Sequence, residues 1–296
     1  MKFGHLEILD NVDFTLPAFE NNFKLISKID FKDVNFYFGA PVWGDKNYIG
    51  VLYPKGTKQN KFLVEYAKQF NSIEVNATRF GTPKSLVLDN WKSAVDSEFK
   101  FSLKVPQVIT HRKNINDIKA RHQLDKLILA VDHLGNNSGI SFAVMANYFK
   151  ADKFNSLVEF VQNIPVDMPL SIEFRDSSWF IPSVMNQWQS LFVEYNIGTV
   201  ITDTPGRRDV AHCRLSGDNL FVRYVGNFNH ISDTHRIKIW VDKIIDSTNF
   251  GVKNVWFYVH QPGEDRGRVL DFFNTFINEL KLKNSKEITL LKDYRL

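Results

Sequence analysis

The amino-acid sequence predicts an α/β protein built as a single (β/α)8 TIM-type barrel with an N-terminal extension. Eight short apolar runs occur between residues 35 and 260, and nearly all are followed by a segment with the apolar spacing of a helix. No linker interrupts this alternation, so one barrel domain is expected. An open doubly wound sheet is the alternative, but the turn after the first run lacks the G-x-G-x-x-G pattern typical of such sheets. The predicted division is an extension over residues 1–34, a barrel over 35–282 and a C-terminal tail over 283–296.

The first two strands are expected at residues 35–40 and 72–76. The first is indicated by its aromatic content, and a helix at about 59–70 follows it. In the second strand successive side chains alternate between faces, which places Glu74 and Asn76 together, opposite the apolar residues. A polar face at the end of a strand that is otherwise apolar is the first indication of a site.

The third strand, at residues 99–105, alternates fully between apolar and polar side chains. This pattern directs four apolar residues toward the helices and Lys104 toward the other face. The loop that follows contains His111. A helix at 83–94 precedes this strand, and a longer one follows from about Asp117 and is expected to stop at Gly135.

The fifth strand carries two opposite charges one strand period apart. It follows a short apolar strand at 140–145 and a helix that ends before Pro165. Within 170–175 the side chains of Glu173 and Arg175 share one face, and the apolar residues share the other. Buried charges without partners are unfavourable by several kcal/mol or more, so these two are expected to pair with each other or to meet a ligand.

Each of the last three strands also ends in a polar residue. These strands are residues 197–203, 220–223 and 255–260, which end in Asp203, Arg223 and His260. Apolar periodicity predicts the remaining helices at 182–196, 232–248 and 269–280, whereas 204–218 shows no helical period. The repeating order of strand and helix completes the barrel pattern.

The overall composition excludes several classes of protein. With 44% hydrophobic residues and 26 Phe in 296 residues, the chain can bury a substantial core. No apolar run approaches the roughly 18 residues of a membrane-spanning helix, so no membrane partner is expected. Cys213 is the only cysteine and the opening residues lack a signal-peptide core, which predicts a cytoplasmic protein. The net charge of +4 permits nucleic-acid binding through Arg207, Arg208 and Arg214 but does not indicate it.

Several short motifs occur in one order along the chain. They are Val75-Asn76-Ala77-Thr78 with Pro83, Lys104-Val105-Pro106 with Thr110-His111, Glu173-Phe174-Arg175 with Ser178-Trp179, and Arg223 with Gly226. In this order and spacing, over roughly residues 35–280, the chain resembles the YecE-like family (domain of unknown function 72). The resemblance implies a (β/α)8 barrel without an established reaction. Arg79 stands where that family has an aromatic residue, and Val225 where it has a histidine.

In a barrel of this kind, ligands bind at the carboxyl ends of the strands, where polar residues of all the strands converge. The residues expected there are Glu74, Asn76, Lys104, His111, Glu173, Arg175, Asp203, Arg223 and His260. Any single pair of them could be only an ion pair that fills the barrel mouth, and His260 alone could be a core histidine. Trp43 and Trp179 could stack on a ring or sugar, although packing in the wall is the more common role.

The charge of this set favours a small anionic ligand that carries a phosphate or carboxylate. Lys104, Arg175 and Arg223 are inward cations, with Arg79 and Arg112 as further candidates. We expect an enzyme in which Glu74 or Glu173 is the general acid or base, Lys104 and Arg175 form an electrostatic clamp, and His111 carries a proton. A hydrolase, lyase or isomerase reaction would fit such a set, and no cofactor is expected.

Two alternatives stay open. The first is a divalent-metal hydrolase or isomerase that uses Glu74, Glu173, Asp203 and His260, although the chain has no H-x-H or H-E-x-x-H motif to support it. The second is a binding module for a metabolite or a nucleic acid without enzymatic activity.

Overall fold

The computed structural model describes residues 3–20, 27–227, 230–261, 268–283 and 288–295. Within these ranges the chain is an α/β fold in which strands and helices alternate. The strands are Asn35–Gly39 (β1), Ser72–Val75 (β2), Lys100–Leu103 (β3), Ser141–Val144 (β4), Leu170–Glu173 (β5), Gly198–Asp203 (β6), Asn219–Val225 (β7) and Asn254–His260 (β8). The helices are Phe62–Ala67 (α1), Ser85–Ser93 (α2), Gln107–Thr110 (α3), Ile118–Leu134 (α4), Phe154–Gln162 (α5), Pro182–Glu194 (α6), Ile231–Ser247 (α7) and Arg268–Lys283 (α8).

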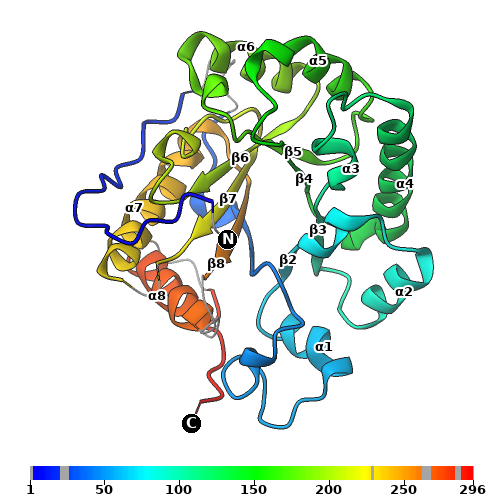
Figure 1. The fold of residues 1–296 in the computed structure, drawn as a ribbon. Helices are drawn as coiled ribbons and strands as arrows, with labels where there is room; N and C mark the ends of the chain where they lie inside the picture. The colour runs from blue at the N-terminus through cyan, green and yellow to red at the C-terminus, as the bar shows by residue number, and fades with distance from the viewer. Residues whose placement is uncertain (1–2, 21–26, 228–229, 262–267, 284–287, 296) are drawn as a thin grey trace.

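The strands pair in parallel in two groups. Six form one sheet in the order β1-β8-β7-β6-β5-β4, and β2 pairs with β3. Helices α4 to α8 lie around the outside of the strands (Figure 1). The backbone ladder of the described strands does not close into a ring. The expected α/β class is therefore confirmed as a mostly parallel fold, whereas the closed TIM barrel is not.

Specific contacts nevertheless connect the two sheets at both junctions. Single parallel bridges join Phe101 to Ser138 and Lys104 to Phe142, beside β3 and β4. At the other junction the side chain of Asn71, just before β2, accepts a hydrogen bond from Phe38 N and donates one to Phe36 O, at 2.9 and 2.6 Å. Because an amide side chain can mimic a backbone group, Asn71 takes the place of a ladder partner for β1.

Gly39 allows β1 to approach β2 closely. A Cβ atom built at this position would lie 2.2 Å from the carbonyl oxygen of Ser72, so no larger residue fits without a backbone shift. The hydroxyl of Tyr66 lies at the same junction, where it accepts a hydrogen bond from Ala40 N and lies 3.1 Å from Ser72 O. Small and polar groups therefore make the close contacts at the junction between β1 and β2.

The strands bury two different faces. One face packs against the helices and includes Phe101 and Phe174, which contact Trp91 and Trp179. The opposite face holds a separate apolar cluster formed by Ile140, Phe142, Val144, Val200, Phe221, Trp256 and Tyr258. This cluster fills the middle of that face and reaches the carboxyl end of β4 at Val144, which lines a pocket together with polar residues that follow the strands.

Helix boundaries follow the sequence signals unevenly. The carboxylate of Asp117 accepts hydrogen bonds from Lys119 N and Ala120 N, so it caps α4, and α4 ends before Gly135 at a φ of 55°. The helix expected at 59–70 is shorter, because only Phe62–Ala67 is α-helical. None of the helices within the described ranges is long and apolar enough to cross a bilayer.

The described part of the N-terminal extension, residues 3–20, has almost no regular structure. Phe14 is buried, and the guanidinium carbons of Arg236 and Arg208 lie 5.0 and 5.3 Å from its ring centre. Farther along, the carboxylate of Glu20 pairs with Arg214 at 2.5 Å. In Figure 1 this segment, in dark blue, runs beside α7. Side chains from distant parts of the sequence therefore hold the extension in place.

Candidate functional site

Four of the predicted residues meet at the carboxyl ends of β2, β5, β7 and β8. The fork of Arg223 donates to both carboxylate oxygens of Glu74, at 3.0 and 2.7 Å, and its Nη1 donates to Glu173 Oε2 at 2.5 Å. His260 Nε2 lies 2.8 Å from Glu74 Oε2. All four side chains are buried. Strand alternation explains the meeting, because each residue lies on the face opposite the helices.

Burial and charge act against each other within this group. Burial disfavours the ionised form of Glu74, but Arg223 and His260 outweigh it and hold the pKa of that carboxyl well below its usual range. Burial likewise opposes ionisation of Glu173, and Arg175 with Arg223 lowers its pKa. For His260, burial lowers the pKa in spite of Glu74. At neutral pH the group therefore consists of two carboxylates, one guanidinium and a neutral imidazole.

Arg175 extends the group toward the surface. Its Nε lies 2.5 Å from Glu173 Oε1, while Arg223 binds the other oxygen of that carboxylate. The ring of Phe3, from the N-terminal extension, lies against the opposite side, with its centre 3.7 Å from the guanidinium carbon of Arg175. Such a cation–π contact orients the guanidinium plane.

Lys104 and Asn76 form a second connection to the carboxylate of Glu74. Lys104 Nζ donates to Asn76 Oδ1 at 3.2 Å, and Asn76 Nδ2 donates to Glu74 Oε1 at 2.8 Å. Burial, together with the neighbouring charge of Arg223, lowers the pKa of Lys104 to about 8. A larger share of this amine is therefore neutral near physiological pH than for an ordinary lysine.

A pocket of about 170 Å³ opens beside Lys104 and Arg175. Its lining is formed by Arg79, Lys104, Val105, Gln107, Thr110, His111, Val144, Met145, Asn147 and Arg175. Three of these side chains are cationic and, among the described residues that line it, none is acidic. The pocket is therefore electropositive, although a buried carboxylate, Glu173, lies directly behind Arg175.

His111 lies at the rim of this pocket in a defined orientation. Its Nδ1 is 2.8 Å from the hydroxyl of Thr110, and Tyr148 donates a hydrogen bond to its carbonyl oxygen. Partial burial, then the charges of Lys104 and Arg79, lower the pKa of His111. The imidazole is thus neutral at pH 7 and can accept a proton.

Asp203 does not join this group, contrary to the sequence prediction. Its carboxylate accepts a hydrogen bond from Trp240 Nε1 at 2.7 Å and pairs with Arg236, both on α7, and with Arg208. The inner cluster includes Val200, so alternation directs Asp203, three positions later, to the helix side. The prediction assumed that every strand end points inward, and for β6 this was wrong.

Neither predicted tryptophan offers a face to the pocket. Trp179 is fully buried between Phe174 and Phe149, with ring centres 4.2 and 5.5 Å away, and its Nε1 donates to Phe149 O. Trp43 packs edge-on against Trp91 at 5.3 Å. Both are wall residues, which is the role that their size favours in a core.

Four of the arginines considered outside the strand ends are each paired with a carboxylate, namely Arg112, Arg207, Arg208 and Arg214, whereas Arg79 lines the pocket. Arg112 Nε lies 2.6 Å from Asp117 Oδ2, and Arg112 is not among the described residues that line the pocket. Arg207 pairs with Asp209 at 2.7 Å, and Arg208 and Arg214 are paired with Asp203 and Glu20 as described above. This pairing reduces the positive field that a nucleic-acid surface would need.

Sequence reasoning missed part of the pocket. Gln107 and Asn147 line it, and Phe3 covers Arg175. Gln107 begins α3, a one-turn helix directly after β3 that has no periodic signal of its own. Nothing in the local sequence links Phe3 to Arg175, 172 positions later, so only the folded chain reveals that contact.

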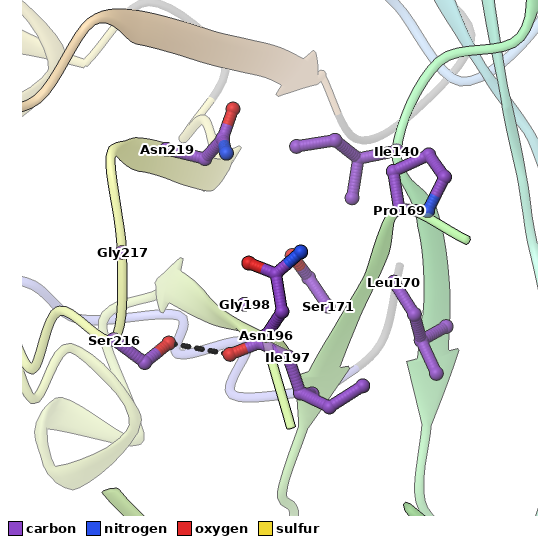
Figure 2. Close-up of a pocket in the computed structure, with 10 residues that line it drawn as sticks. All are labelled: Ile140, Pro169, Leu170, Ser171, Asn196, Ile197, Gly198, Ser216, Gly217 and Asn219. Atoms are coloured by element: carbon purple, nitrogen blue, oxygen red, sulfur yellow. Dashed lines mark hydrogen bonds between the residues drawn. The ribbon is translucent and has the colours of Figure 1, made fainter. Parts of the chain in front are cut away.

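A second pocket lies at the amino ends of the strands, as Figure 2 shows. It has a volume of about 60 Å³ and is lined by Ile140, Pro169, Leu170, Ser171, Asn196, Ile197, Gly198, Ser216, Gly217 and Asn219. Ser216 donates a hydrogen bond to the carbonyl of Ile197 at 2.6 Å. With no charged side chain in its described lining and room for only a few waters, it is a packing feature rather than a ligand site.

Comparison with known proteins gives consistent relatives. The chain is 21% identical to the UPF0759 protein YecE of Escherichia coli K12 over 230 residues, which cover 70% of this chain and 80% of that protein. It is 24% identical to the UPF0759 protein YunF of Bacillus subtilis 168 over 156 residues, which cover 51% and 54% of the two chains. Among solved structures, a DUF72 family protein of Enterococcus faecalis V583 matches 87% of this chain and 98% of its own, with a TM-score of 0.65 and 16% identity.

A DUF72 family protein of Thermotoga maritima MSB8 aligns similarly, with a TM-score of 0.62 and 17% identity, over 84% of this chain and all of that one. At these identities the likeness to solved structures concerns the fold. The family model described as "Protein of unknown function DUF72" matches residues 37–289, which include every strand-end residue described above. The chain therefore belongs to the DUF72 family, as the sequence motifs predicted.

Proposed function

We propose that this protein is an enzyme that binds a small phosphate- or carboxylate-bearing substrate in the pocket beside Lys104 and Arg175. The observation that carries the proposal is the unequal charge of this pocket, where three cationic side chains and a neutral histidine line a space with no acidic group among the described lining residues. An Arg fork binds an oxyanion through two parallel hydrogen bonds, and a lysine adds a point charge.

We further propose that the eight strands surround this site as a (β/α)8 barrel. The parallel pairing, the bridge from Lys104 to Phe142 and the amide contacts of Asn71 support this arrangement. In barrels of this type the carboxyl ends of the strands form the active site, and the pocket lies at that end.

The geometry favours different roles for the acidic and the basic groups. Both oxygens of Glu74 and of Glu173 are held by arginine side chains, and the pKa values of both carboxyls are lowered. They are therefore better suited to orient Arg223 and Arg175 than to exchange protons. His111, which lines the pocket and is neutral, is the group proposed to accept and return a proton.

A thermal-stability measurement tests the anion site. Phosphate at about a hundred times its Kd stabilises a folded protein by about 2.7 kcal/mol, which corresponds to a rise in Tm on the order of 5 °C for a chain of this size. We expect that rise relative to chloride at equal ionic strength. Arg79→Ala should reduce it and Arg175→Lys should abolish it, because these side chains supply the forks.

Arg112→Ala is the matched control, since Arg112 lies next to His111 in sequence but pairs with Asp117. The Arg112→Ala variant should show the same rise in Tm with phosphate as the unmodified protein. Phosphate also stabilises proteins in general by exclusion from their surfaces, and comparison of the pocket variants with this control separates that general effect from binding in the pocket. An equal rise in Tm in all four proteins would contradict the proposal. Stabilisation by manganese or zinc that Glu173→Gln removes, with none by phosphate, would favour a metal-dependent enzyme instead.

A further inference from the structure

Lys104 is a cation whose nearest carboxylates are already committed to other residues. Arg223 binds both oxygens of Glu74, and the two oxygens of Glu173 are divided between Arg175 and Arg223. Within the described ranges, no Asp or Glu oxygen lies within 4.0 Å of Lys104 Nζ. Its hydrogen bond goes instead to the neutral amide of Asn76. Among the described residues, Lys104 therefore has no carboxylate partner and does not serve as half of an ion pair.

The surroundings of Lys104 weaken its hold on the proton. Burial is the largest cause, Arg223 is the second, and together they bring the pKa of the amine down to about 8. Relative to an ordinary lysine, the neutral fraction at pH 7 is then larger by about two orders of magnitude. A neutral amine in a cationic pocket is the usual form of a nucleophilic lysine.

We propose that Lys104 Nζ forms a Schiff base with an aldehyde or ketone that carries a phosphate or carboxylate group. This inference rests on the proposed anion site, because Arg79 and Arg175 would hold the charged group and so bring the carbonyl carbon to Nζ. The pocket volume of about 170 Å³ limits the ligand to a compact molecule of a few carbons. Asn76, which accepts a hydrogen bond from Nζ, fixes the position of the amine.

The chemistry balances without any further reagent. The lone pair of neutral Nζ attacks the carbonyl carbon, a proton passes from nitrogen to oxygen, and a carbinolamine forms. His111, which lines the same pocket, takes the proton from nitrogen and returns it to the hydroxyl, which leaves as water. The carbon–nitrogen double bond that remains is an imine of Lys104, and hydrolysis reverses each step.

Reductive trapping tests the inference on the intact protein. The probe is glycolaldehyde phosphate with sodium cyanoborohydride, which supplies hydride to the imine and converts it to a stable secondary amine. Glycolaldehyde without phosphate is the matched probe, and peptide mass mapping locates the adduct. Lys100, at the start of the same strand and hydrogen-bonded to Asn136, is the internal reference for background reaction.

We expect at least about tenfold more adduct on Lys104 than on Lys100 at pH 7, because the lowered pKa of Lys104 raises the neutral fraction of its amine and the pocket beside it holds the phosphate group. Labelling should increase with pH with a midpoint near the pKa of about 8. Inorganic phosphate should compete with the phosphate-bearing probe, and Lys104→Arg should remove the adduct at this position while the Arg112→Ala control keeps it.

Equal labelling of Lys104 and Lys100, or equal labelling of Lys104 by both probes, would overturn the inference. These outcomes are distinct from failure of the anion site. If phosphate raises Tm as expected but no adduct forms on Lys104, the Schiff-base inference is wrong and the anion site stands. If phosphate has no effect on Tm and does not compete, both are wrong.

Discussion

Arg223 is the residue on which the charge balance of the strand ends depends. It is fully buried and makes close contacts with two carboxylates from different strands, β2 and β5. Each carboxylate is ionised because arginine side chains outweigh the effect of burial. Removal of Arg223 would leave both in a region that excludes water, with Glu173 still paired to Arg175.

We predict that Arg223→Met lowers the free energy of unfolding by about 3–5 kcal/mol, because it leaves buried charge uncompensated. Denaturant unfolding measures this loss. In contrast, Arg112→Ala removes a partly exposed ion pair with Asp117 and should lower stability by at most about 1 kcal/mol. A loss for Arg223→Met no larger than that of the control would contradict the role assigned to the cluster.

Single residues also show what local sequence can and cannot reveal. Glu173 and Arg175 were assigned to one face by alternation alone, and the structure brings their charged atoms within 2.5 Å. Asp203 was assigned to the same site because it ends a strand. Its partners Arg236 and Trp240 lie on α7, more than 30 positions later, so no local pattern could indicate that the side chain faces the helices.

At the scale of elements, β3 illustrates how one strand serves packing and function on its two faces. Phe101 is fully buried on the helix side, with its ring 5.0 Å from Phe99 and 5.5 Å from Trp91. Lys104 follows the strand and lines the pocket on the other side. Alternation predicted both directions, because the pleat of a strand fixes them irrespective of distant contacts.

We predict that Phe101→Ala lowers the free energy of unfolding by about 3–5 kcal/mol through the cavity that it leaves. Lys104→Ala should change stability far less, since it removes no carboxylate pair among the described residues. Leu86→Ala on α2 is the apolar control, because Leu86 is 71% exposed. Denaturant melts of the three variants compare them, and a loss for Lys104→Ala as large as that for Phe101→Ala would mean that the ammonium is structural.

At the scale of the whole molecule, the alternation of strands and helices could be predicted from the sequence because apolar residues recur at regular spacing in each element. The conformation of the N-terminal extension could not be predicted in this way. Residues 3–20 form almost no regular structure, and contacts from Phe3 to Arg175 and from Phe14 to Arg208 and Arg236 hold them. The family model matches from residue 37 onward, so Phe3, which covers Arg175, lies outside the residues that match the family.

The two ends of the strands hold pockets of different character. The end shown in Figure 2 has a small pocket lined by backbone and neutral side chains. The opposite end has the electropositive pocket, in which Arg175 is paired with the buried carboxylate of Glu173. An oxyanion should therefore bind at the end with the electropositive pocket and not at the other end. A crystal structure that contains the anion would show directly which pocket it occupies.

The most direct measurement is a crystal structure grown with selenate, a tetrahedral oxyanion whose selenium is located by anomalous scattering. We predict the strongest selenium peak between Arg79, Lys104 and Arg175, with guanidinium nitrogens at the roughly 2.7–2.9 Å typical of charge-assisted hydrogen bonds. Crystals of Arg175→Lys should show a weaker peak there. A well-ordered pocket without a selenium peak, or the strongest peak at the other end of the strands, would show that this pocket is not an anion site.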